Sequence, residues 1–306
     1  MTDAGLLTDL TPEAERLLDR HLGMAKEWFP HEYVPWGRGR DFVPGEAWDA
    51  DGYPVSDAVR SALFVNLLTE DNLPYYFSTI DRVFAPAATP GDVWRTWNRR
   101  WTAEENRHAI VIRDYLTVTR ALDPVALERA RMHQMCSAVV PEPATVADGL
   151  VYVALQELAT RIAHRNTGKS LDDKVGFEVM ARVAADENLH YLFYRDLVTA
   201  ALELDPSVLV CAIERQVRDF EMPGVGIPDF GAHAMAIARA GIYDFEIHYE
   251  QILVAVVLRH WKIESIEGLS PEAETARANV VRYIDRVGRA ARRFVARRAE
   301  RVPSTV

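Results

Sequence analysis

Two short segments of the chain share one residue spacing, and this spacing limits the fold more than any other feature. Residues 104–108 read EENRH and residues 186–190 read DENLH, so that each segment contains Glu-x-x-His. Residues three apart on a helix lie on the same face, where a Glu and a His can hold one metal ion together. Two such helices facing each other would bring two Glu and two His into the interior of a helical bundle.

Helical periodicity covers almost the whole chain, and no alternating strand pattern of useful length is present. The expected helices average more than roughly 20 residues, against a usual ~11–12, and this length suits an all-α bundle. Pro74 predicts a kink or a local break in the second helix, and Thr167-Gly168 predicts the end of the fifth. We expect helices over 11–29, 56–84, 91–121, 123–138, 143–166, 171–203, 205–223, 229–261 and 271–301, with loops at 30–54, 85–90 and 223–228.

Two further glutamates fit a metal centre inside such a bundle. A carboxylate-bridged di-iron centre needs one more carboxylate from each of the two remaining helices. Glu70 and Glu157 lie in apolar helical stretches, 35 and 30 residues ahead of the glutamates at 105 and 187. Carboxylate and imidazole ligands with open positions suit iron, whereas zinc sites usually have four ligands and fewer carboxylates. The predicted ligands are Glu70, Glu105, His108, Glu157, Glu187 and His190.

The ordinary interpretation of each of these residues is structural, because a lone buried Glu is usually ion-paired and a buried His is usually a hydrogen-bonded core residue. The six together, in this order and spacing, favour a metal site instead. Glu104 and Asp186 each stand one residue before a motif glutamate. A rotation of about 100° per residue turns them away from the metals, so we expect outer-shell or surface roles for both.

Composition excludes several classes of function. The formal net charge of -10 argues against nucleic acid as a partner. The longest aliphatic run, residues 252–258, is far shorter than the ~20 residues of a membrane helix. Cys136 and Cys211 form no CxxC pair, and no Lys or Arg precedes Arg16, which argues against a signal or transit peptide. We therefore expect a cytoplasmic protein with no transmembrane segment.

The C-terminal stretch is strongly basic although the chain as a whole is acidic. Residues 277–301 contain nine Arg against Asp285 and Glu300. This helix is one candidate for docking an acidic partner, and a solvated outer face is the alternative. Other candidates for the same role are Arg107, Arg113 and Arg131.

Residues 101–108 (WTAEENRH) resemble the signature of the soluble acyl-acyl carrier protein desaturases, of the plastid stearoyl type and its actinobacterial relatives. Residues 69–76 (TEDNLPYY), 156–160 (QELAT, followed by Asn166-Thr167) and 185–190 (ADENLH) resemble the family's other ligand helices. The likeness runs in order from about Trp36 to Leu197. It implies a ferritin-like di-iron four-helix bundle in one domain over 1–306, with a core at about 56–203 and further long helices at about 205–301.

The resemblance also implies a function and roles for individual residues. The six predicted ligands would bind two irons, with Glu105 and Glu187 bridging, and Thr160 would place a hydroxyl beside the O₂ site. Trp36 and Asp186 would lie on an electron route to the iron bound by His108. The reaction would be O₂-dependent desaturation of a fatty acyl chain on acyl carrier protein, with ferredoxin as electron donor and a homodimer as the assembly.

An alkyl C–H bond offers ordinary side chains no acidity or polarity, so the cofactor would carry the chemistry while the protein holds the chain and excludes water. Apolar residues near the ligands could line a channel for the acyl chain, or they could simply form core: Phe64, Leu67, Tyr76, Phe77, Val153, Leu155 and Val183.

The chain departs from the family pattern at three positions. Ala109 stands where Gly is frequent, Leu189 takes a slot that is often basic, and Tyr191 follows the second His. These changes leave the ligands intact and put the substrate and regiospecificity in doubt. The alternatives are a di-iron hydroxylase or N-oxygenase, a ferritin-like iron store or ligand-sequestering binder, and a non-catalytic acyl-carrier-binding paralogue.

Overall fold

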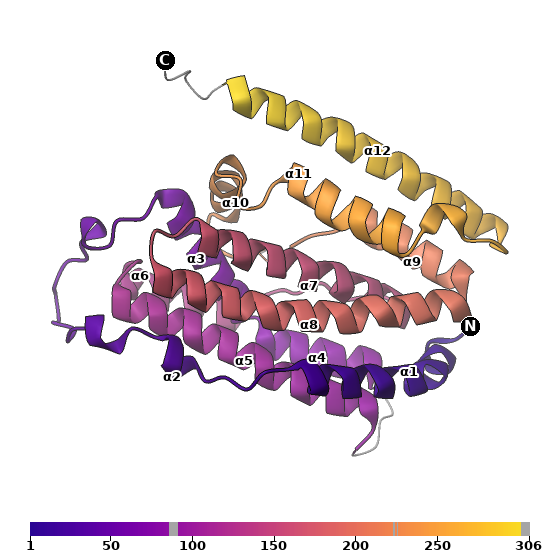
Figure 1. Ribbon diagram of the computed structural model, residues 1–306, viewed down its shortest axis with the longest axis horizontal. Coiled ribbons are helices and arrows are strands. Elements are labelled where there is room, and N and C mark those ends of the chain that lie inside the picture. Colours follow the sequence, from indigo (N-terminus) through magenta and orange to yellow (C-terminus); the bar gives the residue numbers. More distant parts are fainter. Residues whose placement is uncertain (86–90, 223, 225, 301–306) are drawn as a thin grey trace.

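A bundle of long antiparallel helices forms the centre of the molecule (Figure 1). The computed structural model describes residues 1–85, 91–222, 224 and 226–300, without the side chains of 297–300, and contains no strand in those ranges. The bundle consists of α5 (Val93–Thr119), α7 (Val146–Lys169), α8 (Lys174–Leu204) and a broken fourth member, α3 (Asp57–Glu70) followed by α4 (Leu73–Phe84). The expected all-α bundle is therefore present.

The remaining helices cover this bundle. α1 packs against α8 and α5, α9 packs against α7 and α8, and α12 lies on α9 at the outer edge (Figure 1). No helix in the described ranges is both long enough and apolar enough to cross a membrane. The covering elements are α1 (Asp3–Met24), α2 (Pro30–Tyr33), α6 (Pro124–Ser137), α9 (Pro206–Arg218), α10 (Phe230–Arg239), α11 (Phe245–Ile247), the π-helical segment His248–His260 and α12 (Pro271–Glu300).

The break predicted at Pro74 is confirmed. Pro74 is the second residue of α4, where the lack of an N–H costs least. Buried Asp71 in the connection accepts two hydrogen bonds from Arg131 of α6, at 2.7 Å from Nε and 2.9 Å from Nη2. The break is thus fixed in place, and Glu70 becomes the last residue of α3.

The bounds of α1 and α7 differ from the predicted bounds. α1 begins at Asp3 instead of residue 11, because Leu6 and Leu10 are buried against the bundle and this packing outweighs the proline at position 12. α7 continues through Gly168 to Lys169. Gly168 is needed there for close packing, since a Cβ would lie 2.9 Å from Cβ of Met180 on α8.

The predicted helix over 229–261 is wrong as a single element. α10 ends at Arg239, and Gly241, with a φ of 71°, turns the chain before α11 and the π-helical segment. Glycine adopts this left-handed conformation without strain. The predicted turn at 85–90 lies largely outside the described residues, as do positions 223 and 225 of the predicted loop at 223–228.

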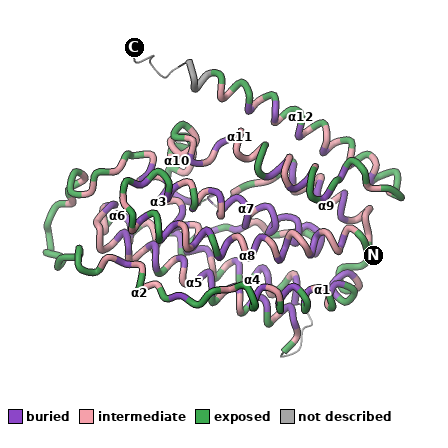
Figure 2. Tube along the Cα trace, viewed as in Figure 1, coloured by how far each residue is buried: buried purple, intermediate pink, exposed green. Residues whose placement is uncertain are grey.

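Buried residues run along the helices of the bundle (Figure 2), and the apolar ones form two clusters. On α5, Trp101 belongs to one cluster and Val111 to the other. On α8, Tyr191 belongs to the same cluster as Trp101, and Val183 belongs to the same cluster as Val111. Both Glu-x-x-His motifs therefore fall where the two apolar clusters meet, in the middle of the bundle.

Candidate metal centre

The structure brings all six predicted ligand side chains together, and all six are buried. Glu70 comes from α3, Glu157 from α7, and the two motifs from α5 and α8. They form two overlapping groups, Glu70/Glu105/His108/Glu187 and Glu105/Glu157/Glu187/His190, within each of which the ligand atoms lie within 4.8 Å of one another. Glu105 and Glu187 belong to both groups, and this is the arrangement that two bridged metal ions require.

Both histidines turn Nδ1 toward the carboxylates. His108 Nδ1 lies 3.3 Å from Glu105 Oε2 and 3.5 Å from Glu187 Oε1. His190 Nδ1 lies 2.7 Å from Glu105 Oε1 and 3.7 Å from Glu157 Oε2. Although these atoms lie close together, both Nδ1 atoms, Glu105 Oε1 and Glu157 Oε2 make no hydrogen bond of suitable geometry to another described residue. Buried polar atoms rarely lack a hydrogen bond. Carboxylate and imidazole ligand atoms that face one another in this way fit divalent iron.

The pKa shifts within the cluster also fit a site for bound cations. Burial raises the pKa of Glu157 well above its usual range, and the negative charge of Glu187 adds to the effect. Burial and Glu187 raise the pKa of Glu105 as well. Burial alone would lower the pKa of His190, but the surrounding carboxylates raise it well above its usual range. The cluster therefore holds protons that metal ions would displace.

Glu104 and Asp186 occupy outer-shell positions, as predicted from their place on the helix. Glu104 Oε2 lies 3.0 Å from Nε2 of His190, and Asp186 Oδ2 lies 3.6 Å from Nε2 of His108. Each carboxylate faces the nitrogen that points away from the centre. Carboxylates in this position orient the imidazole and increase its strength as a ligand.

The structure does not place Trp36 beside Asp186. Trp36 is 52% exposed, and its indole N–H donates to the His31 carbonyl at 2.9 Å. Trp28 takes the expected place, because its Nε1 donates to Asp186 Oδ2 at 2.7 Å and it is only 3% exposed. Trp28 was not predicted, because the expected helix 11–29 contained it, whereas α1 ends at Met24 and leaves Trp28 in an extended segment.

Thr160 lies at the edge of the cluster, and a histidine that was not predicted lies inside it. Thr160 Oγ1 donates to the Glu157 carbonyl at 3.0 Å, and its side chain borders a cavity of about 20 Å³ beside the glutamates. Nε2 of buried His164 lies 2.7 Å from Glu70 Oε1. The available signal was its position seven residues after Glu157, two turns further along the same face of α7.

Two small cavities lie at and near the cluster. Tyr76 borders the cavity of about 20 Å³ and also a second one of about 10 Å³ between α4 and α7, and its hydroxyl lies 3.2 Å from that of Tyr152. Gly149 borders the second cavity, where an added Cβ would lie 2.9 Å from Phe84 Cζ. Of the residues expected to line a channel, Tyr76 and Val153 border these cavities. Each cavity suits about one water, so a longer ligand requires side chains to move.

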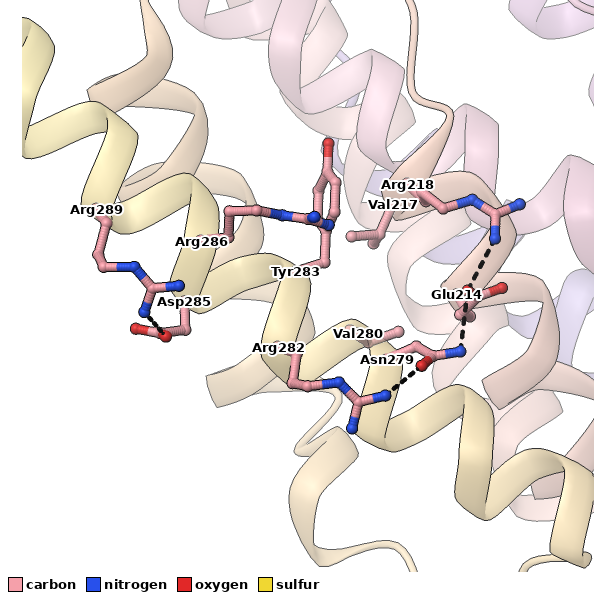
Figure 3. A pocket seen from close by; sticks show the side chains of 10 residues that line it. All are labelled: Glu214, Val217, Arg218, Asn279, Val280, Arg282, Tyr283, Asp285, Arg286 and Arg289. Carbon is pink, nitrogen blue, oxygen red and sulfur yellow. Dashed lines mark hydrogen bonds and ion pairs between the residues drawn. The ribbon is translucent and has the colours of Figure 1, made fainter.

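A separate groove of about 600 Å³ lies between α9 and α12 (Figure 3). Arg218 on α9 bonds Glu214 at 3.1 Å, while Arg282 on α12 donates to Asn279 at 2.5 Å. The guanidinium of Arg286 lies over the Tyr283 ring at 5.2 Å from its centroid. This groove is basic and has no carboxylate–imidazole group among the described residues, so it is distinct from the candidate metal centre.

Comparisons with known proteins agree with this geometry. The family model for fatty acid desaturase matches residues 2–305. The chain is 42% identical to a Mycobacterium tuberculosis protein assigned as acyl-acyl carrier protein desaturase DesA1, over 90% of this chain and 83% of the relative. It is 33% identical to the chloroplastic stearoyl-acyl carrier protein 9-desaturase 6 of Arabidopsis thaliana, over 77% of this chain and 63% of the relative.

A solved structure gives the same result for the fold. The X-ray structure assigned to acyl-acyl carrier protein desaturase DesA2 of M. tuberculosis matches with a TM-score of 0.69 and 27% identity, covering 89% of this chain and 99% of that chain. The helical bundle is therefore of the ferritin-like type expected for this group. The chain belongs to the fatty acid desaturase family and is, like its relatives, an oxidoreductase.

Proposed function

We propose that the protein desaturates a fatty acyl chain carried on acyl carrier protein, in an O₂-dependent reaction at a di-iron centre. The observation that carries the proposal is the pair of overlapping four-residue groups that share Glu105 and Glu187. Glu70 and His108 complete one group, and Glu157 and His190 complete the other. The family supports acyl desaturation, and the donor set supports iron.

Reduced iron bound at this centre would activate O₂ and remove hydrogen from an unactivated C–H bond, a reaction that no side chain of the chain can perform alone. The protein's own contribution is to bind and orient. Apolar clusters on both sides keep water from the centre. Tyr76 and Thr160 border the cavity beside the carboxylates, where an acyl carbon and O₂ would meet.

The electron route that we propose uses Trp28 in place of Trp36. Trp28 and Arg107 both donate to Asp186, and Asp186 faces His108. This series of contacts leads from the N-terminal segment to one side of the centre. A ferredoxin-type donor, a homodimer and a cytoplasmic location complete the proposal, and these three rest on the likeness to the family.

The carrier would dock on the basic groove between α9 and α12. Acyl carrier proteins are acidic, so the guanidinium groups of Arg282 and Arg286 complement them (Figure 3). The other candidate arginines are already paired: Arg107 with Asp186, Arg113 with Glu128, and Arg131 with Asp71. Docking in the groove would use guanidinium groups that make fewer bonds to carboxylates.

A single-turnover assay tests the function. Chain loaded with Fe(II) and reduced is mixed with a panel of acyl-acyl carrier proteins under O₂, and the acyl products are read by mass spectrometry. We expect one chain length to lose two hydrogens. Gain of one oxygen atom would show hydroxylation instead, and unchanged acyl chains in the presence of bound iron would contradict the proposal.

A further inference from the structure

His21 lies on α1, outside the six-residue set, and reaches the candidate centre through Glu104. It is 3% exposed, and its Nε2 lies 2.9 Å from Glu104 Oε2. The same oxygen lies 3.0 Å from Nε2 of His190, whose Nδ1 faces Glu105. One carboxylate oxygen thus joins two buried imidazoles, and one of these belongs to the predicted ligand set.

The surroundings of Glu104 determine which nitrogens donate. Its carboxylate faces donors on both sides: Nε2 of His21 and of His190 at Oε2, and Arg100 at Oε1. An ionised carboxylate only accepts hydrogen bonds, so Nε2 of both histidines carries the proton. Once a metal ion displaces the other proton of His190, the lone pair lies on Nδ1, the atom that faces the other carboxylates.

A similar arrangement of contacts occurs on the opposite side of the centre. Trp28 donates to Asp186, and Asp186 faces the outer nitrogen of His108. His21 and Trp28 both come from the N-terminal segment and not from the four bundle members. Each outer carboxylate therefore receives one buried N–H from outside the bundle.

We propose that His21 is a positioning residue, which holds the Glu104 carboxylate so that it fixes His190 for the metal on its side. This inference rests on the proposed di-iron centre. Arg100 pairs with the other oxygen of Glu104. Without the N–H of His21, the carboxylate is free to turn toward Arg100 and away from His190. Loss of such an outer contact typically weakens metal binding by about 10–100-fold.

A structural role for His21 makes a different prediction. Its ring packs edge-on against Trp97, with centroids 5.0 Å apart. His21→Phe keeps an aromatic ring at this position but has no N–H, whereas His21→Gln keeps a side-chain N–H donor. Leu17→Ala is the matched control, because Leu17 is fully buried on the same helix, in the apolar cluster.

The test is anaerobic titration of the full-length chain with ⁵⁷Fe(II), followed by Mössbauer spectroscopy. We expect His21→Phe to bind one iron with wild-type affinity and the other at least about tenfold more weakly, with only one iron signal altered. His21→Gln should resemble the wild type. Leu17→Ala should lower the melting temperature and leave both iron signals unchanged.

Two results would overturn the inference: wild-type affinity for both irons in His21→Phe, or equal weakening in His21→Gln and His21→Phe. If His21→Phe does not fold, ¹⁵N spectra of the wild-type chain loaded with Zn(II) decide the question. Protons on Nε2 of both His21 and His190 support the inference, and an unprotonated His21 Nε2 refutes it. If the wild-type chain takes up no iron, the proposed centre itself is refuted. If the wild-type chain binds two irons and His21→Phe binds them with the same affinity, only the role of His21 is refuted.

Discussion

Replacement of Asp186 by asparagine tests the outer shell of the candidate centre. Asp186 is 2% exposed and accepts hydrogen bonds from Trp28 at 2.7 Å and Arg107 at 3.2 Å, with a further short contact to Arg182. Burial alone would raise its pKa, but His108 and Arg182 lower the pKa to about 2, so Asp186 is ionised at neutral pH. Asp186→Asn therefore removes a buried charge and places an amide N–H₂ among donors.

Loss of one partner from a buried ion pair costs about 3–5 kcal/mol, because the remaining charge is left uncompensated. The side chains of Arg107 and Arg182 are only 20% and 12% exposed, so water compensates little of this cost. We expect the free energy of unfolding of the metal-free chain to fall by about 3–5 kcal/mol in urea titrations followed by circular dichroism. Fe(II) affinity on the His108 side should fall by about 10–100-fold.

Asp172→Asn is the matched control, because Asp172 is exposed just ahead of α8 and the chemical change is the same. It should alter the free energy of unfolding by less than about 0.5 kcal/mol. A loss below about 1 kcal/mol in Asp186→Asn would contradict this expectation, because it would mean that the buried charge is not needed to compensate the two arginines.

Three other predictions concern different parts of the chain. Gly149→Ala adds a Cβ at the small cavity between α4 and α7, so the ratio of turnover on long to short acyl chains should fall; an unchanged ratio would place the acyl chain elsewhere. Burial lowers the pKa of His248 to about 4 from about 6.5 when unfolded, so the free energy of unfolding should fall by about 2 kcal/mol from pH 7 to pH 5. This loss should be absent in His248→Gln. The double variant Arg282→Glu/Arg286→Glu should bind the carrier about tenfold more weakly at low salt. The control Arg99→Glu, on the exposed surface of α5, should not. Equal carrier affinity in the double variant and the control would exclude the groove as the docking site.

The clustering of the six candidate ligands could be predicted because its signal is local. Glu-x-x-His places both side chains of a pair on one helix face, whatever the helix packs against. Glu70 and Glu157 could be added because apolar sequence around a glutamate predicts burial. The broken second helix followed in the same way from Pro74, since proline restricts the backbone regardless of tertiary contacts.

The residues that contact the carboxylates in and around the centre from other parts of the chain could not be predicted, because they depend on contacts between segments far apart in the sequence. His21 meets Glu104 across 83 residues, and His164 meets Glu70 across 94. Trp28 was missed because the end of α1 depends on packing against α8 and α5, and not on a local stop signal. The same dependence on packing accounts for Gly168 inside α7.

The proposed function depends on six side chains from four bundle members that would hold two irons. Crystals of the iron-loaded chain, measured with X-rays on both sides of the iron absorption edge, test this most directly. We expect two anomalous peaks, one among Glu70, Glu105, His108 and Glu187 and one among Glu105, Glu157, Glu187 and His190. No iron within the bundle, or a single iron between His21 and Glu104, would contradict this expectation.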